Sequence, residues 1–137
     1  MNVIELVKMH EGFSSKPYKC PAGKLTIGYG RNLDANGITK EEADFMLSED
    51  IENIYLEMTK ILHCFADLDD VRQAVFVDMG YNMGLRGFLK FKNMLKAVEA
   101  HDYTEAAKEM LDSEWAKQVK KRAVRLAKMM ETGEWPS

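Results

Sequence analysis

One long apolar repeat constrains the fold more than any other feature of this sequence. Between residues 39 and 62, apolar side chains recur at helical spacing for roughly six turns. That is longer than a typical helix of a globular protein. Thr39 and Glu42 form the pattern of a capping box, so the helix begins there. A helix of this length can connect two lobes of one chain.

The chain length fits one domain with two lobes. Its 137 residues suffice for one substantial core but not for two ordinary independent domains. The net charge of -3 gives no support to nucleic-acid binding. Residues 117 to 128 are nevertheless strongly basic and contain no acid, so this segment could face an anionic polymer or form a solvated helix face.

An amphipathic helix is predicted before the long one. The apolar run from Val3 to Met9 has helical spacing, and Gly12 is a natural stop, which places Glu11 in the last turn. The negative end of the helix dipole disfavours an ionised carboxylate, and burial would do the same. Glu11 is therefore a candidate proton donor.

A β-hairpin is predicted after this helix. Residues 25 to 30 alternate apolar side chains with Thr26, Gly28 and Gly30, so one strand face is apolar and the other nearly bare. If residues 21 to 24 form the turn with Ala22 opposite Lys24, Cys20 lies directly opposite Thr26. Thiol, hydroxyl and a shallow glycine surface then share one face.

The remaining residues give a coarser prediction. Residues 31 to 37 resemble a turn-rich linker, and the apolar run from Val71 to Met79 predicts a buried central helix that ends near Gly80 to Gly84. We expect the helical structure to be interrupted at Arg86-Gly87. A last, unbroken helix is expected from Trp115 to Met130 and should stop at Gly133. We expect most of the ten methionines in the core.

The order of the polar residues resembles the phage-type lysozymes, the endolysins of glycoside hydrolase family 24 of which T4 lysozyme is the type. In that pattern a glutamate is followed after eight residues by Asp or Cys, and after five more by Thr. Glu11, Cys20 and Thr26 occupy these positions, within the sequence Thr-Ile-Gly-Tyr-Gly. Further counterparts occur in order at residues 37–43, 81–84 and 122–135.

The resemblance implies an α+β fold that is mainly α and lysozyme-like. A small lobe carrying the β-hairpin would span about residues 12–38, and a connecting helix about 39–62. A helical lobe would span about 63–137, with the N-terminal helix 1–11 packed on it. The cleft between the lobes would bind glycan.

The resemblance also implies a muramidase that hydrolyses β-1,4 bonds in bacterial peptidoglycan. Glu11 would protonate the leaving oxygen, and Cys20 with Thr26 would act on water. Alternatively, a Cys20 thiolate would attack the sugar. We favour the water route, because a thiolate beside a charged Glu11 would be repelled. The commoner residue at the Cys20 position is aspartate.

Supporting residues follow from the same resemblance. Arg122 matches an arginine that pairs with the catalytic glutamate. Tyr18, Gly28, Gly30 and Arg31 are expected to support the site or bind substrate. No cofactor or metal is expected, because the sequence has no nucleotide-binding motif and its two cysteines lack metal-ligand spacing.

Other functions remain open at this point. A lytic transglycosylase could use Glu11 alone as acid and base and release an anhydro sugar. A homologue with impaired catalysis could only bind glycan, or the basic last helix could bind nucleic acid. We expect a monomer whose partner is peptidoglycan and not nucleic acid.

The expected route to the substrate involves a second phage protein. The N-terminal run is too short for the apolar core of a signal peptide, and no stretch approaches membrane-spanning length. We therefore expect synthesis in the host cytoplasm without stable membrane insertion. Action on the wall would follow permeabilisation of the membrane by a separate phage protein.

Overall fold

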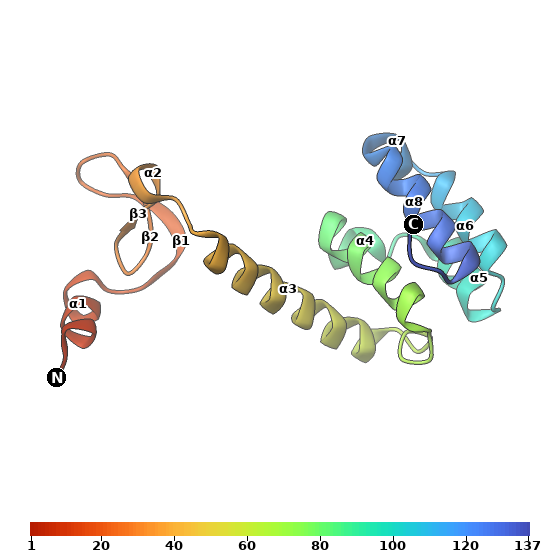
Figure 1. Ribbon diagram of the computed structural model, residues 1–137, viewed down its shortest axis with the longest axis horizontal. Coiled ribbons are helices and arrows are strands. Elements are labelled where there is room, and N and C mark those ends of the chain that lie inside the picture. The colour runs from red at the N-terminus through yellow and green to blue at the C-terminus, as the bar shows by residue number, and fades with distance from the viewer. The chain divides into compact units, whose positions relative to one another are not determined.

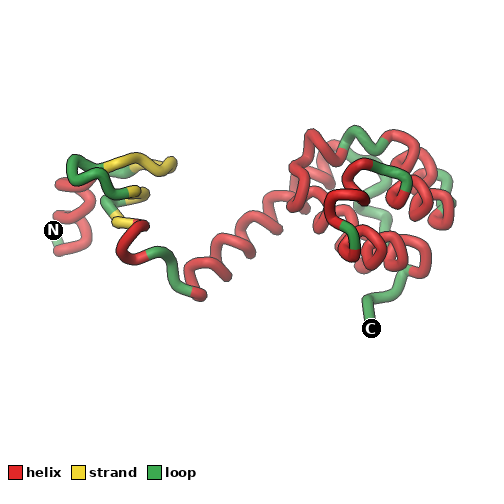
Figure 2. The backbone as a smooth tube through the Cα atoms, turned by 90° about the horizontal axis from the view of Figure 1, so that it is seen from above, coloured by secondary structure: helices red, strands yellow, loops and turns green.

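The computed structural model describes residues 1–137 and divides into two compact units, Met1–Met46 and Leu47–Ser137. Figure 1 labels the elements, and Figure 2 shows that every strand belongs to the first unit. The second unit is built from helices and loops. The predicted fold class, α+β and mainly α, is therefore confirmed. The predicted packing of the N-terminal helix on the helical lobe stays a prediction.

Helix α1 (Val3–Glu11) has well-defined ends. Asn2 accepts a hydrogen bond from the backbone of Glu5, whose side chain in turn accepts one from the backbone of Asn2. This reciprocal pair satisfies donors at the helix start that have no partner inside the helix. Gly12 has φ of 69° and ends the helix, so Glu11 occupies the last turn as predicted.

Three antiparallel strands in the order β1-β2-β3 form the only sheet. They are β1 (Ser14–Lys19), β2 (Leu25–Gly28) and β3 (Arg31–Asn32). The predicted linker at residues 31 to 37 was wrong, because β3 and the short helix α2 (Leu33–Asn36) lie there. The Asn32 side chain caps α2, and the backbone N–H of Leu25 donates to Asp34 at 2.7 Å. These local bonds fix α2 against β2.

The predicted apolar face of β2 was also wrong. Leu25 and Tyr29 are 37 % and 44 % exposed, whereas Thr26 is only 4 % exposed. Tyr29 lies beyond the end of the strand, and the Thr26 hydroxyl donates to the Lys24 carbonyl at 2.9 Å. A buried hydroxyl is tolerated when such a bond satisfies it.

Helix α3 (Lys40–Ile61) begins in the first unit and continues into the second. Its predicted capping box is confirmed. The backbone N–H of Thr39 donates to Glu42 at 2.8 Å, and the N–H of Glu42 donates to the Thr39 hydroxyl at 3.1 Å. The start and the length of this helix were therefore predicted correctly from the long apolar repeat and the capping box.

The second unit contains the hydrophobic core. Its further helices are α4 (Asp70–Phe88), α5 (Lys92–Glu99), α6 (Tyr103–Leu111), α7 (Glu114–Val119) and α8 (Lys121–Thr132). Phe76 contacts Phe65 and Phe88, with ring centroids 6.0 and 4.9 Å apart. The buried methionines are Met58, Met79, Met94, Met110, Met129 and Met130. Met46 is 51 % exposed, so the methionine prediction holds for the helical unit only.

The kink in α4 falls within Gly80 to Gly84, where the central helix is expected to end, but the predicted break at Arg86-Gly87 and the predicted unbroken last helix were wrong. Within α4 the non-helical residue is Gly84, with φ of 81°, and Arg86-Gly87 stays helical. Lys120, with φ of 51°, divides the predicted last helix into α7 and α8. Glycine adopts positive φ without penalty, but a lysine gives no such signal in the sequence. The predicted stop at Gly133 is confirmed.

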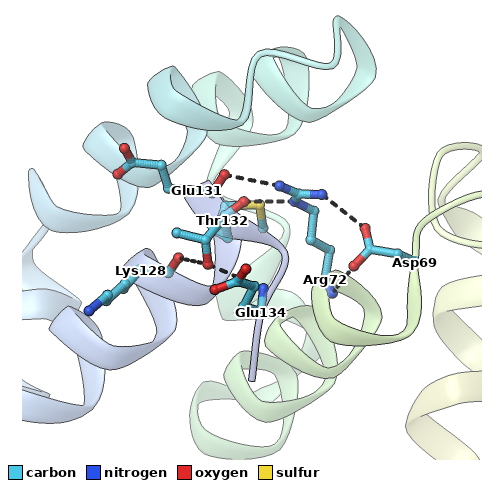
Figure 3. A network of polar contacts seen from close by, with 7 residues as sticks. Asp69, Arg72, Lys128, Glu131, Thr132 and Glu134 are labelled. Carbon is cyan, nitrogen blue, oxygen red and sulfur yellow. Dashed lines mark hydrogen bonds and ion pairs between the residues drawn. The ribbon is translucent and has the colours of Figure 1, made fainter. Parts of the chain in front are cut away.

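Arg72 of α4 contacts α8 and α6, and Figure 3 shows its bonds to Asp69 and to the end of α8. Its guanidinium donates to the carbonyls of Met130 and Glu131 at 2.7 and 3.0 Å, at the end of α8. It also pairs with Asp69 at 3.1 Å and lies 3.6 Å from the ring centre of Tyr103. A cation that satisfies the last carbonyls stabilises a helix C-terminus. This contact fixes the segment after α8. No helix of the chain combines the length and apolarity needed to cross a membrane.

Candidate active site

The Glu11 carboxyl group lies against Gly30. A Cβ atom on Gly30 would be 2.7 Å from the Glu11 carboxyl carbon, a distance that real Cβ contacts do not reach. Gly30 has φ of +75°, which also favours glycine. Glu11 is exposed and makes no ion pair or side-chain hydrogen bond within the first unit. The burial that the sequence argument assumed for Glu11 is therefore not seen in this unit.

Aromatic contacts hold the β2–β3 turn beside the end of α1. The Lys8 ammonium lies 5.2 Å from the ring centre of Tyr29, within the range of a cation–π contact. Phe13 contacts the same ring, with centroids 5.5 Å apart. Together with the Glu11–Gly30 contact, they place a carboxyl group at the edge of the sheet.

The hairpin register differs from the predicted one. Cys20 donates its N–H to the Lys24 carbonyl at 2.9 Å, and Tyr18 is the partner of Thr26. The predicted pairing of Cys20 with Thr26 was therefore wrong. The cause is a loop of Pro21, Ala22 and Gly23, in which Gly23 adopts φ of 79°. A type I turn followed by a left-handed glycine is a common hairpin connection.

The thiol and the hydroxyl nevertheless share a face of the hairpin. Cys20 is two residues from Tyr18, and Tyr18 pairs with Thr26. Alternate residues of a strand point to the same side, so Cys20 and Thr26 are diagonal neighbours. Tyr18, 38 % exposed, lies on this face as well.

The environment of Cys20 lowers the pKa of its thiol. The largest cause is a hydrogen bond from the backbone of Lys24, and partial burial opposes it. The backbone of Ala22 and the Thr26 hydroxyl contribute in the same direction as Lys24. That hydroxyl has one proton, which it donates to the Lys24 carbonyl in this structure, so it must rotate to serve a thiolate.

Arg31 forms an ion pair with Glu42. Its guanidinium contacts the Glu42 carboxylate at 2.6 Å and the Gly37 carbonyl at 3.3 Å. The Arg31 hydrogen bond, followed by one from the backbone of Thr39, lowers the pKa of Glu42 to about 2. The pair links β3 to the start of α3, and the expected role of Arg31 in supporting the site or binding substrate stays a prediction.

A pocket of about 700 Å³ lies on the first unit beside this pair. Gly28, Tyr29 and Arg31 line it from the sheet, and no atom would contact a Cβ on Gly28 within 4 Å. Ile38, Phe45 and Met46 line it from the α3 side. The glycine surface predicted from the sequence is therefore open at Gly28, whereas the Glu11 carboxyl group covers Gly30.

Arg122 lies in the second unit and is held by Asp78. Its Nε and Nη2 atoms both contact one carboxylate oxygen of Asp78 at 2.9 Å. Both side chains are partly exposed. The pairing of Arg122 with Glu11 stays a prediction.

Several of these partners were missed from the sequence. Asp78 was detectable, because it is a lone carboxylate in the apolar run around Val77 and Met79. Lys24 acts on the Cys20 pKa and on the Thr26 hydroxyl through its backbone, and a pattern of side chains does not reveal such contacts. No three His, Cys, Asp or Glu side chains are grouped so that they could hold a metal ion.

The first unit thus combines a free carboxyl group with a thiol and a hydroxyl on one hairpin face. A proton donor and a group that acts on water or on the sugar are what a glycoside hydrolase requires. The chain belongs to the phage lysozyme family, whose family model matches residues 8–130. Membership of this family indicates glycoside hydrolase activity.

Curated relatives agree with this assignment. A probable T4-type lysozyme of Dictyostelium discoideum is 28 % identical over 96 % of this chain and 95 % of its own length. An endolysin of Acyrthosiphon pisum secondary endosymbiont phage 1 is 30 % identical over 83 % of this chain and 77 % of its own. The pre-baseplate central spike protein Gp5 of enterobacteria phage T4 is 28 % identical over the whole chain, which spans 29 % of that protein.

Proposed function

We propose that this protein is a phage endolysin that hydrolyses the β-1,4 bond between N-acetylmuramic acid and N-acetylglucosamine. Its biological role would be lysis of the host cell, after a separate phage protein has permeabilised the membrane. Family membership and the similarity to an endolysin support the substrate class. The observation that carries the mechanism is the unpaired Glu11 carboxyl group against Gly30.

Glu11 acts as the general acid in this proposal. It gives its proton to the glycosidic oxygen as the bond to the anomeric carbon breaks, so the leaving sugar departs with a hydroxyl group. Because Gly30 has no side chain, the carboxyl group can lie against the turn, and its exposed side is left for substrate. No other side chain of the first unit engages Glu11 in an ion pair.

Cys20 and Thr26 act on the water that completes the reaction. The Thr26 hydroxyl donates its hydrogen bond to the Lys24 carbonyl, so the lone pairs of its oxygen can accept a hydrogen bond from water. The Cys20 sulfur accepts a hydrogen bond from the same water and polarises it, a role that the thiol fills without ionising. The water then attacks the anomeric carbon, and the anomeric configuration inverts. The proton of the attacking water passes to bulk solvent.

The Glu11→Gln variant tests this function. The amide keeps the shape of the side chain but cannot give a proton, so clearing of a peptidoglycan suspension should fall by about 10² to 10⁴-fold. Glu52→Gln, an exposed glutamate on α3, is the matched control and should clear like the wild type. Circular dichroism verifies the fold of both. Near-normal clearing by Glu11→Gln would remove the mechanism.

The products test the reaction type. Hydrolysis leaves muramic acid with a free reducing end, whereas transglycosylation leaves an anhydro sugar. We expect reducing ends, detected by borohydride reduction and mass spectrometry of the released fragments. Anhydro products would assign the chain to the transglycosylases instead.

A further inference from the structure

The exposed side of α8 carries cations that have no acidic partner. Lys121, Arg125 and Lys128 are spaced four and three residues apart, so they lie on one stripe of the helix. All three are exposed, and none forms an ion pair. Arg72 and Arg122 of the same unit are both paired. In a chain of net charge -3, this stripe is a local positive surface.

A pocket at the end of this stripe adds an aromatic wall. It has a volume of about 270 Å³ and is lined by Arg125, Lys128, Thr132, Glu134 and Trp135, among others. The Trp135 side chain is 61 % exposed. An exposed indole beside cations offers both an apolar face for stacking and attraction for an anion.

Hydrogen bonds order the wall of this pocket. The Thr132 hydroxyl donates to the Lys128 carbonyl at 2.9 Å and accepts from the Glu134 N–H at 3.2 Å. Arg72 holds the adjacent carbonyls of Met130 and Glu131. Figure 3 shows the Lys128 ammonium directed away from the Arg72 cluster. The cation is therefore free for a ligand, while the backbone before Trp135 is fixed.

We propose that this pocket, the α8 pocket, binds a sugar of the cell wall together with a carboxylate of its attached peptide, apart from the hairpin residues. The proposal rests on the proposed function, which makes the wall the substrate. Peptidoglycan combines sugar rings with the carboxylates of its peptides. Trp135 stacks on a ring, Arg125 and Lys128 attract a carboxylate, and Glu134 accepts from a sugar hydroxyl.

The Glu134 carboxylate disfavours a nucleic acid at this position. A nucleic acid carries a phosphate on every nucleotide, so the Glu134 carboxylate repels it along its length, whereas a wall fragment can place its one carboxylate at Arg125 and Lys128 and a neutral sugar at Glu134. A saccharide has hydroxyl donors that a carboxylate can accept. Binding to DNA is therefore an outcome that the test includes and that would contradict the proposal.

The test is sedimentation with purified sacculi free of lipid and protein. All variants carry Glu11→Gln, so that the sacculi persist during the measurement. We expect the double variant Arg125→Ala, Lys128→Ala to bind about tenfold more weakly at low salt, as the loss of two exposed charge pairs predicts. The double variant Lys60→Ala, Lys96→Ala removes two exposed, unpaired lysines elsewhere and should bind like the parent.

Two further arms identify the ligand chemistry. Sacculi whose carboxyl groups are converted to neutral amides should bind the parent and the Arg125, Lys128 variant equally. Trp135→Ala should weaken binding to both kinds of sacculi, and Trp135→Phe should restore it, because a stacked ring does not need the carboxylate. Thermal unfolding verifies that these exposed substitutions leave the fold intact.

Three results would overturn the proposal. The first is equal affinity of the Arg125, Lys128 variant and the control variant for native sacculi. The second is that the parent still binds amidated sacculi more tightly than the Arg125, Lys128 variant does. The third is tighter binding of the parent to double-stranded DNA than to sacculi. The clearing assay is independent, because it uses the chain with Glu11 intact. Failure of clearing with normal sacculus binding would reject the proposed function alone.

Discussion

The Glu11 carboxyl group and Gly30 are in contact, and the carboxyl carbon lies 2.7 Å from the place of a Cβ atom on that glycine. The contact joins the last turn of α1 to the β2–β3 turn. A glycine at this position therefore does two things. It adopts a backbone conformation with φ of +75°, and it leaves room for the carboxyl group.

Gly30→Ala should damage activity more than stability. The new methyl group must displace the flexible Glu11 side chain, and a misplaced catalytic group can cost about 100-fold in rate. The control is Gly37→Ala, which has a similar positive φ of +56° but open space around the Cβ position. Both variants should lose about 1 to 2 kcal/mol from backbone strain. Clearing rates and thermal unfolding compare them, and equal activities would contradict the steric argument.

The two thiols should react at different pH. The pKa of Cys20 is lowered, mainly by the backbone of Lys24, whereas burial raises that of Cys64. Only the thiolate is alkylated, so the iodoacetamide reaction of Cys20 should rise at lower pH than that of Cys64. Peptide mapping by mass spectrometry at a series of pH values measures both sites in one sample, with each serving as the reference for the other.

A variant at Thr26 separates the causes of this difference. Thr26→Val removes the hydroxyl contribution but keeps the backbone of Lys24, so the Cys20 curve should move only part of the way toward higher pH. The Cys64 curve should stay in place. The explanation fails if Cys64 is alkylated at the same pH as Cys20 in the wild type.

The sequence predicted those features that depend on local residue patterns. The capping box of Thr39 and Glu42 and the helix ends at Gly12 and Gly133 are set by side chains within one turn, and all three are confirmed. The break at Lys120 could not be predicted, because nothing in a lysine indicates positive φ.

The candidate site was predicted by residue identity but not by geometry. Glu11, Cys20 and Thr26 could be selected from their spacing, yet the hairpin register was wrong. The loop has three residues, Pro21, Ala22 and Gly23, where pairing of Ala22 with Lys24 would leave only Gly23, and several loop lengths fit the same strand pattern. The Glu11–Gly30 contact depends on how α1 meets the sheet, which no local pattern encodes.

The ion pair of Arg31 with Glu42 should make stability depend on pH. The folded state lowers the pKa of Glu42 from 4.5 to about 2, mainly through Arg31. The stabilisation is therefore complete above about pH 4.5 and is lost as the pH falls toward 2. Both side chains are about 40 % exposed, so the effect is small. Thermal unfolding of Glu42→Gln should show a weaker loss of stability over this range than the wild type.

The neighbouring Glu41 provides the control for this ion pair. It lies on the same first turn of α3 and makes no ion pair, so Glu41→Gln should follow the wild-type curve between pH 4.5 and 2. Hydrogen exchange at the amide groups of residues 39–43 localises the effect to the start of α3. A Glu42→Gln curve parallel to the wild type would mean that the pair contributes nothing.

Substitutions of Cys20 should distinguish water assistance from covalent catalysis. If Cys20 assists water, Cys20→Ser retains measurable clearing, because a hydroxyl can still orient water beside Thr26, and Cys20→Asp is well tolerated as a base that is ionised at neutral pH. If Cys20 is the nucleophile, Cys20→Ser is nearly inactive, because serine provides no low-pKa thiolate. Clearing assays of the purified variants give the first answer.

The anomer that is first released gives the second answer, because a single displacement by water inverts the anomeric carbon and a covalent intermediate retains its configuration. NMR of the early products resolves the two anomers before they interconvert. Alkylation of Cys20 alone cannot decide, since a bulky adduct would block the site under either mechanism. We expect residual activity of Cys20→Ser with inversion. An inactive serine variant together with retention would assign Cys20 as the nucleophile and leave Thr26 to position the sugar.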